Sequence, residues 1–291
     1  MTDSVLVVQL HLRTNQEIEL KHFSGFVSRG LFFNIISESN SNFSVEQHEK
    51  RQMAPYSCSP LMTQNEKGQH VLYRKVFQRF FVSFAFLDSS ISNSFVEHFT
   101  RQDALQLSIL NNKVELEELR VFNYSYSDLV TNNDEFTGFT VDFITPTSFR
   151  KPHPFYPLRY IRKIYPNIVP DMKSRYRFYP VPDPQLLFRN LLRIWKRFSD
   201  HRLPYEDYIS WLDGGGVVIK GFENLRTQLF YEHETTKKWI VGFVGRVAFS
   251  MPKDMYDKEM ARITNALLKF GELVNVGVGR TSGFGMFRII D

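Results

Sequence analysis

Cysteine is almost absent from this sequence of 291 residues, in which Cys58 stands alone. An internal disulfide needs two cysteines, so it is excluded, and so is any zinc site built from several cysteines. The eight histidines include no pair with the helical spacing and carboxylate neighbours of a zinc site. We therefore expect a protein of a reducing compartment, with no metal ion and no other cofactor.

Long apolar runs are also absent. The longest nearly unbroken one, residues 80–87, contains Ser83 and is far shorter than the roughly 20 residues that a membrane-spanning helix needs. The first residues include Asp3 and soon reach Gln9, and they lack the basic start and apolar stretch of a signal peptide. The sequence thus predicts no membrane partner and a cytoplasmic location.

Apolar residues are plentiful in spite of this: 43% of the residues are hydrophobic and 15% are aromatic, with 28 Phe. Such a composition argues against disorder and supplies ample material for packed cores. The length is about twice that of a typical domain, so two units of roughly 140 residues are favoured over one.

The first half alternates between the two-residue period of strands and the three- and four-residue steps of helices. The pattern predicts the order β-α-β-β-α-β. The expected elements are a strand over 4–13, a helix over 21–37, a short helix over 45–51 capped by Ser44, a strand within 55–61, a strand over 75–87, a helix from a cap at Asn93 to Arg101, and a strand over 113–123.

The second half repeats this order, but its first helix starts late, where Asp183 can cap it and Pro184 suits its first turn. The other expected elements are a strand over 138–146, strands over 217–231 and 239–250, a helix with Met260, Ile263, Leu267 and Phe270 on one side, and a strand over 284–290. We predict an α+β fold of two tandem ferredoxin-like domains, residues 1–130 and 131–291, with a basic, proline-rich insertion at 149–182.

Positive charge is concentrated in one segment. The whole chain carries a formal charge of +5, whereas residues 150–202 hold thirteen Lys or Arg against three acids. Aromatic residues lie among these cations, a mixture that pairs attraction for phosphate with stacking on unpaired bases, although a solvated helix face is the alternative reading. We predict RNA contacts from six of these cations: Arg159, Arg162, Lys163, Arg175, Arg193 and Arg197.

Residues 275–286 form a glycine-rich loop near the end of the chain. Its glycines permit positive φ and close backbone approach, so its N–H groups can point at phosphates while Arg280 supplies charge. The residues predicted to bind RNA are Gly277, Gly279, Arg280, Thr281, Ser282, Gly283 and Gly285. A dinucleotide-binding turn is disfavoured because the loop has one residue too many and follows a helix, and a P-loop because no Gly-Lys-Ser/Thr ends it. An ordinary turn into the last strand is the remaining alternative.

Four segments resemble one known family. The loop is similar to the C-terminal signature of the repeat-associated RNA-binding protein (RAMP) superfamily. The segments TPTSF at 145–149, PVPDPQLLFRNLLRIW at 180–195 and QHEKRQMAPYSCSPL at 47–61 resemble its CRISPR repeat-processing endoribonucleases. They are spread over almost the full length, in the order found in that family.

The resemblance implies binding of CRISPR repeat RNA and cleavage without a metal, in which the ribose 2′-OH attacks the phosphate and leaves 2′,3′-cyclic phosphate and 5′-OH ends. His48 matches the catalytic histidine, which transfers protons near neutral pH. Arg51 or Lys50 would stabilise the phosphate, and Arg29 is a further candidate. Without the resemblance, a solvated surface histidine is the usual reading of such a residue.

Two other functions remain open. A non-catalytic RAMP subunit of a CRISPR interference complex would share the fold and the loop, but it has no evident need for a histidine flanked by cations. A nucleotide-binding metabolic enzyme is disfavoured because no carboxylate cluster or P-loop lies near the glycines. Association of the endoribonuclease with a multi-subunit complex is a further expected partnership.

Overall fold

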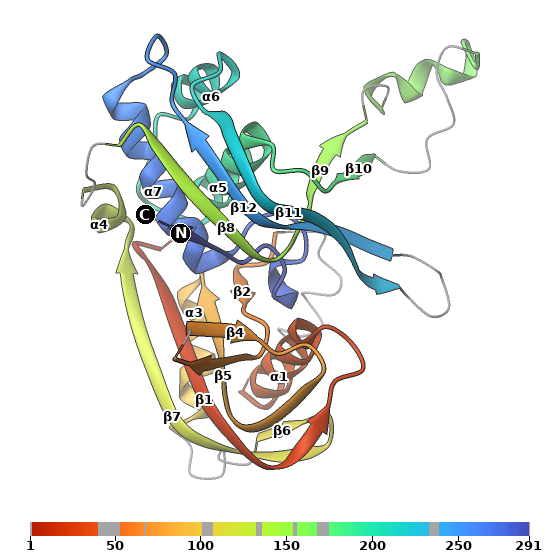
Figure 1. Cartoon of the computed structure of the whole chain (residues 1–291), viewed down its shortest axis with the longest axis vertical. Helices are drawn as coiled ribbons and strands as arrows, with labels where there is room; N and C mark the ends of the chain where they lie inside the picture. Colours follow the sequence, from red (N-terminus) through yellow and green to blue (C-terminus); the bar gives the residue numbers. More distant parts are fainter. Residues whose placement is uncertain are drawn as a thin grey trace.

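In the described part of the chain, the computed structural model has two large β-sheets, each covered by helices on one face, and a separate two-stranded sheet (Figure 1). It describes residues 2–39, 53–66, 68–100, 107–131, 136–153, 156–167, 175–232 and 239–290. Within these residues, no helix is long and apolar enough to cross a membrane.

The first sheet contains the strands of the N-terminal half in the order β4-β3-β5-β1-β7-β6, with β2 paired to β5. Its long central strand β1 pairs antiparallel with β5 on one side and β7 on the other. The elements are β1 (Ser4–Glu19), α1 (Ser24–Ser39), β2 (Tyr56–Cys58), β3 (Met62–Asn65), β4 (Gly68–Val71), β5 (Lys75–Phe86), α3 (Ser89–His98), β6 (Leu107–Ile109), β7 (Asn112–Ser125) and α4 (Tyr126–Thr131).

Alternation of side chains along β1 and β5 explains the first core. Val8, Leu10 and Val82 point to the face on which α1 and α3 pack, and all three are fully buried. The predicted helix near residue 93 exists, but its predicted cap is wrong. Asp88 begins α3 and accepts from the backbone N–H groups of Ser90 and Ile91, because its carboxylate precedes the first turn.

The second sheet has the order β11-β12-β8-β13, and α5 and α7 cover one of its faces. As predicted, Asp183 caps α5: its carboxylate accepts from Leu186 N at 3.1 Å, and Pro184 occupies the first turn. The elements are β8 (Gly138–Thr147), β9 (Phe149–Pro152), η2 (Tyr156–Lys163), β10 (Tyr176–Tyr179), α5 (Pro184–Phe198), α6 (Tyr205–Asp213), β11 (Val218–Glu232), β12 (Trp239–Ser250), α7 (Lys258–Val274), η3 (Arg280–Ser282) and β13 (Phe287–Ile290).

Both sheets place their strands in the same order. The four strands of a ferredoxin-like unit are β1, β2, β5 and β7 in the first sheet, and β8, β11, β12 and β13 in the second. If the four strands are numbered along the chain, they lie side by side in the order 4-1-3-2 in both sheets, and neighbouring strands are antiparallel. This duplicated arrangement confirms the prediction of two tandem ferredoxin-like units. The last strand begins at Phe287, later than predicted, because residues 284–286 belong to the glycine-rich loop. The β3–β4 hairpin and α6 were not predicted, and the predicted short helix over 45–51 lies outside the described residues.

The described part of the insertion at 149–182 projects from the second unit (Figure 1), and we call it the arm. Strands β9 and β10 pair antiparallel at its base, and η2 extends beyond them, away from both sheets (Figure 1). The division of the chain between residues 130 and 131 stays a prediction, since α4 runs across it.

The second core takes residues from the first sheet. Val5, Ala85 and Leu87 belong to it, together with Tyr126 at the start of α4. The fully buried Tyr126 ring meets Trp195 of α5 edge-on, with ring centroids 4.7 Å apart. The two units therefore share apolar surface and are expected to unfold together.

We expect Tyr126→Ala to lower the free energy of unfolding by about 3–5 kcal/mol, because it removes a large buried ring between the two units. Tyr126→Phe keeps the ring and should cost roughly 1 kcal/mol or less. Urea titrations of both variants measure this. A Tyr126→Ala protein as stable as the Phe variant would show that the ring does not join the units.

Candidate functional site

The glycine-rich loop, residues 275–286, lies between the two sheets. It connects α7 to β13, and η3 within it packs against α1 and β2 (Figure 1). Three hydrogen bonds join it to the segment that contains β2. The Cys58 thiol donates to Thr281 O at 3.1 Å, Asn275 Nδ2 donates to Cys58 O at 2.9 Å, and Arg280 Nη2 donates to Ala54 O at 2.9 Å. The loop is thus docked on the N-terminal unit.

Close backbone packing accounts for the glycines. Gly277, Gly279, Gly283 and Gly285 all have positive φ, between 73° and 82°, as predicted. A Cβ atom at Gly285 would lie 1.7 Å from Val276 O, and one at Gly283 would lie 2.7 Å from Pro60 N. The close approach that the sequence predicts is therefore an approach to the protein's own backbone.

Most N–H groups of the loop already donate to acceptors within the protein. Gly277 N, for example, donates to Asn190 Oδ1 at 2.9 Å, and Val278 N donates to Ser148 O at 2.9 Å. The residues engaged in this way are Val276, Gly277, Val278, Ser282, Gly283, Phe284, Gly285 and Met286. Phosphate binding by the loop amides stays a prediction, and few of these amides are left for it.

Arg280 does not face solvent. Its side chain is only 7% exposed, and its guanidinium donates to Val274 O at 3.1 Å as well as to Ala54 O. Burial, with a smaller contribution from the nearby charge of Arg193, lowers the pKa of Arg280 to about 10. The predicted RNA contact by Arg280 is untested, and this position favours a role inside the protein.

Arg29 reaches the same junction from α1. The side chains of Arg29 and Thr281 lie close enough to the Tyr56 hydroxyl to lower its pKa in part, and the Arg29 guanidinium lies 5.4 Å from the centroid of the Phe33 ring. Tyr56 itself is 2% exposed, its ring stacks on Phe32 at 3.9 Å, and burial raises its pKa. Tyr56 therefore serves packing and orientation, as its place in a strand suggests.

Of the predicted catalytic residues, the structure places Arg29 at this junction. His48, Lys50 and Arg51 lie outside the described residues, in the segment 40–52 between α1 and Met53.

Helix α5 contributes a basic face whose cations differ in their partners. Arg189 forms an ion pair with Asp213, in which Nη2 donates to both carboxylate oxygens. Lys196 Nζ lies 3.9 Å from the Tyr205 ring centroid. Arg193 and Arg197 are exposed and have no ion pair within the described residues. Arg193 is the one whose charge acts on Arg280, which places it beside the glycine-rich loop.

The arm begins at the loop. Ser148 O accepts from Val278 N directly before β9, and the described part of the insertion contains no carboxylate. Arg175 is exposed and lies 5.1 Å from the Tyr176 ring, and Lys163 at the end of η2 is also exposed. Arg162 is half-buried, and Arg159 lies in η2. The predicted RNA-binding residues thus form two groups, one beside the loop and one along the arm.

Sequence reasoning missed Asn190, Asn275 and Ala54, which hold the loop in place. The spacing of Asn190 and Asn275 along the sequence does not mark either residue as functional. Ala54 contributes only its backbone carbonyl, which any residue could supply, so its role cannot be predicted from its side chain. Within the described residues, no group of three or more His, Cys, Asp or Glu side chains is placed to hold a metal ion.

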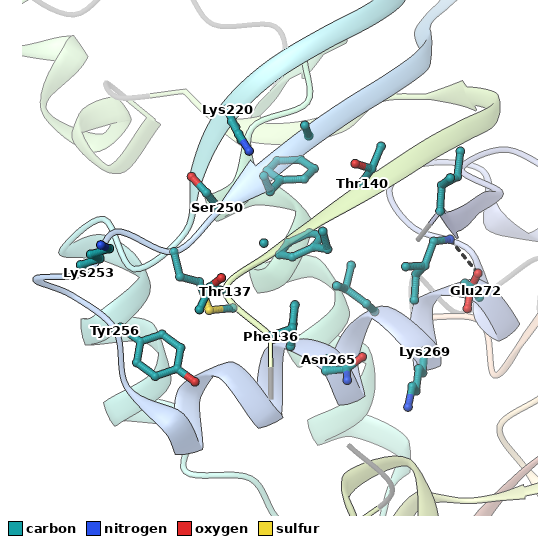
Figure 2. A pocket seen from close by; sticks show the side chains of 18 residues that line it. Phe136, Thr137, Thr140, Lys220, Ser250, Lys253, Tyr256, Asn265, Lys269 and Glu272 are labelled. Carbon is teal, nitrogen blue, oxygen red and sulfur yellow. Dashed lines mark hydrogen bonds between the residues drawn. The ribbon is translucent and has the colours of Figure 1, made fainter. Parts of the chain in front are cut away.

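A cavity of about 1020 Å³ lies elsewhere, around β8, β12 and α7 (Figure 2). Lys220 and Thr140 come from the strands, whereas Asn265 and Lys269 come from α7. Glu272 at its rim accepts from Ile289 N at 2.8 Å. This hollow contains none of the predicted site residues.

We expect Gly285→Ala to destabilise the protein, because a left-handed backbone costs a residue with a Cβ about 1–3 kcal/mol and the clash with Val276 O adds to this. Gly30→Ala is the matched control: Gly30 is exposed in α1 with no atom within 4 Å of a Cβ, and alanine there should add roughly 0.5–1 kcal/mol. Urea unfolding compares them. Equal unfolding free energies would contradict the close packing at Gly285.

Comparison with known proteins identifies the family. Residues 141–287 match the profile of the family described as CRISPR-associated endoribonuclease Cas6, whereas no curated protein matches the chain. The fold is similar to a Thermus thermophilus Cas6 in a product complex, with TM-score 0.73, 18% identity, and 99% of this chain and 100% of that chain covered. A second Cas6 product complex gives TM-score 0.68 at 19% identity over 99% and 100%, and a Cas6-related protein from Pyrococcus furiosus gives 0.55 at 10% over 99% of each chain. Because the matched profile spans half of the sequence, this chain belongs to the CRISPR-associated endoribonuclease Cas6 family.

Proposed function

We propose that this protein binds CRISPR repeat RNA and cleaves precursor transcripts into guide RNAs by a metal-independent attack of the ribose 2′-OH. Family membership supports the reaction class, and structurally similar Cas6 proteins have been solved with product and with a substrate mimic. The observation that carries the proposal is the junction at which the glycine-rich loop meets α1 and the segment before β2, because the predicted residues Arg29 and Arg193 lie beside the loop there.

His48 is proposed as the proton-transferring residue. Segment 40–52 starts from the end of α1 and returns at Met53, next to Ala54, whose carbonyl is bound by Arg280. Met53 follows His48 by five positions, so chain length alone keeps their Cα atoms within about 18 Å. The segment thus follows the helix that carries Arg29 and precedes the strand in which the Cys58 thiol donates to Thr281 O.

The reaction needs little beyond proton transfer and charge stabilisation. The 2′-oxygen loses its proton and bonds to phosphorus, and the 5′-oxygen leaves and takes up a proton, giving a 2′,3′-cyclic phosphate and a 5′-OH. His48 would act as general base or acid. Lys50 or Arg51, together with Arg29, would stabilise the negative charge that develops on the phosphate.

The RNA is proposed to follow the two groups of cations. Arg193 and Arg197 extend from the junction along α5, and the arm carries Lys163 and Arg175 with aromatic neighbours. Since the arm starts at the loop, RNA held at the junction can continue along it without leaving positive surface. Arg159 and Arg162 in η2 belong to the same proposed path.

We expect His48→Ala to slow cleavage of end-labelled repeat RNA by about 10²–10⁴-fold, which is the usual contribution of a general acid or base. The assay uses excess chelator and single-turnover conditions. His70→Ala is the matched control, since His70 is an exposed histidine hydrogen-bonded to Asn65 outside the junction.

The outcomes separate the candidate functions. Cleavage at one site by wild type and His70→Ala, with a 2′,3′-cyclic end, supports the nuclease. A 2′-deoxy substitution at the mapped site should abolish cleavage and preserve binding. Tight binding without cleavage by any of the proteins would instead indicate a non-catalytic subunit of an interference complex. Equal cleavage by His48→Ala would remove His48 from the mechanism, and full dependence on a divalent ion would overturn the metal-independent reaction.

For binding, we expect Arg193→Gln and Arg197→Gln to weaken repeat affinity. Each should reduce the salt dependence of log K by about 0.7 for every phosphate of a single strand that the variant no longer neutralises. Arg189→Gln is the control on the same helix, because Asp213 already neutralises Arg189. Fluorescence anisotropy over a range of salt concentrations measures the slopes. If all three variants lower the slope equally, free and paired cations do not differ in RNA binding.

A further inference from the structure

A buried guanidinium links three segments at the junction. Arg280 donates to Val274 O at the end of α7 and to Ala54 O before β2. Its own backbone carbonyl accepts from Gly283 N within the loop at 3.4 Å. Among the described residues, no carboxylate forms an ion pair with it.

Such a placement is costly and therefore informative. Transferring a cation from water into the protein interior is unfavourable unless its donors find acceptors, and here two carbonyl oxygens accept from the Nη1 and Nη2 groups. A residue used only to attract phosphate gains nothing from burial, because exposed arginines such as Arg193 supply charge at the same place without that cost. The geometry suits a residue that fixes the position of backbone segments.

We propose that Arg280 is a positioning residue that holds Ala54, and with it the start of β2, in register with the glycine-rich loop. The inference rests on the proposed function, and it replaces direct RNA contact as the role of Arg280. The planar fork of arginine is needed because it reaches two carbonyls at once, whereas a lysine presents a single compact charge.

Arg280→Lys separates positioning from charge. It keeps the cation and loses the fork, so we expect single-turnover cleavage to fall about 10²-fold, as for a small displacement of a catalytic group. Repeat affinity and its salt slope should stay within about twofold of wild type, in contrast to Arg193→Gln. Arg262→Lys, an exposed arginine on α7 paired at 4.0 Å with Glu259, is the matched control and should leave every value unchanged.

A second variant guards against loss of folding. Arg280→Ala leaves space for the missing group, so added guanidinium ion at a concentration below that which unfolds the protein should restore cleavage, and methylammonium should not. Thermal unfolding in the same buffers reports whether the variants are folded. Rescue of rate without a change in affinity is a result that a merely stabilising residue would not give.

Three results would overturn the inference. Wild-type cleavage by Arg280→Lys shows that the fork is unnecessary. A loss of affinity and salt slope equal to that of Arg193→Gln shows that Arg280 binds phosphate. Failure of guanidinium to rescue a folded Arg280→Ala protein shows that the missing group does not act by position. A wild-type protein that binds RNA and never cleaves it would remove the proposed function as well, which distinguishes the two failures.

Discussion

Backbone-to-backbone packing at the glycine-rich loop is the constraint on which the junction depends. Gly283 lies against Pro60, and Gly25 of α1 lies so close to Ser282 that a Cβ there would be 1.9 Å from its carbonyl oxygen. Because glycine has no Cβ atom, only glycine at positions 25 and 283 permits the loop to lie this close to α1 and to Pro60. The approach in turn brings the Cys58, Asn275 and Arg280 side chains within hydrogen-bonding distance of backbone carbonyls. The loop works first as a joint between two units, and any contact with RNA depends on that joint being formed.

The shared core explains how such a joint is kept rigid. The core built on α5 and α7 includes three side chains from the first unit, Val5, Ala85 and Leu87. The two units therefore cannot separate without exposing apolar surface. Asn190 fixes Gly277 from α5, on the same helix that buries Trp195 in that core. Orientation of the loop is therefore tied to the packing of the second unit, and its contacts with α1 and β2 carry that orientation to the first.

The sequence predicted the fold better than the site, for physical reasons. Periodicity along 239–250 and 258–274 specifies a strand and a helix because one face of each is buried, and the Asp183-Pro184 pair marks a helix start by local chemistry alone. The positive φ of the four glycines was also foreseeable. Nothing local could reveal that Arg280 is buried, since its acceptors are carbonyls of Val274 and Ala54, which any residue could supply.

The same limit applies to the basic segment, where a count of cations treats unlike groups as equal. Arg189 is neutralised by Asp213, a residue of the unpredicted helix α6, and Lys196 rests on Tyr205 of that same helix. The buried Arg280 guanidinium donates its hydrogen bonds to backbone carbonyls within the protein. Arg193 is exposed on α5 beside the loop and has no ion pair within the described residues. Burial and pairing thus divide the cations into those that build the junction and those left to meet a polyanion, and this division, more than the formal charge of +5, determines where RNA is expected to bind.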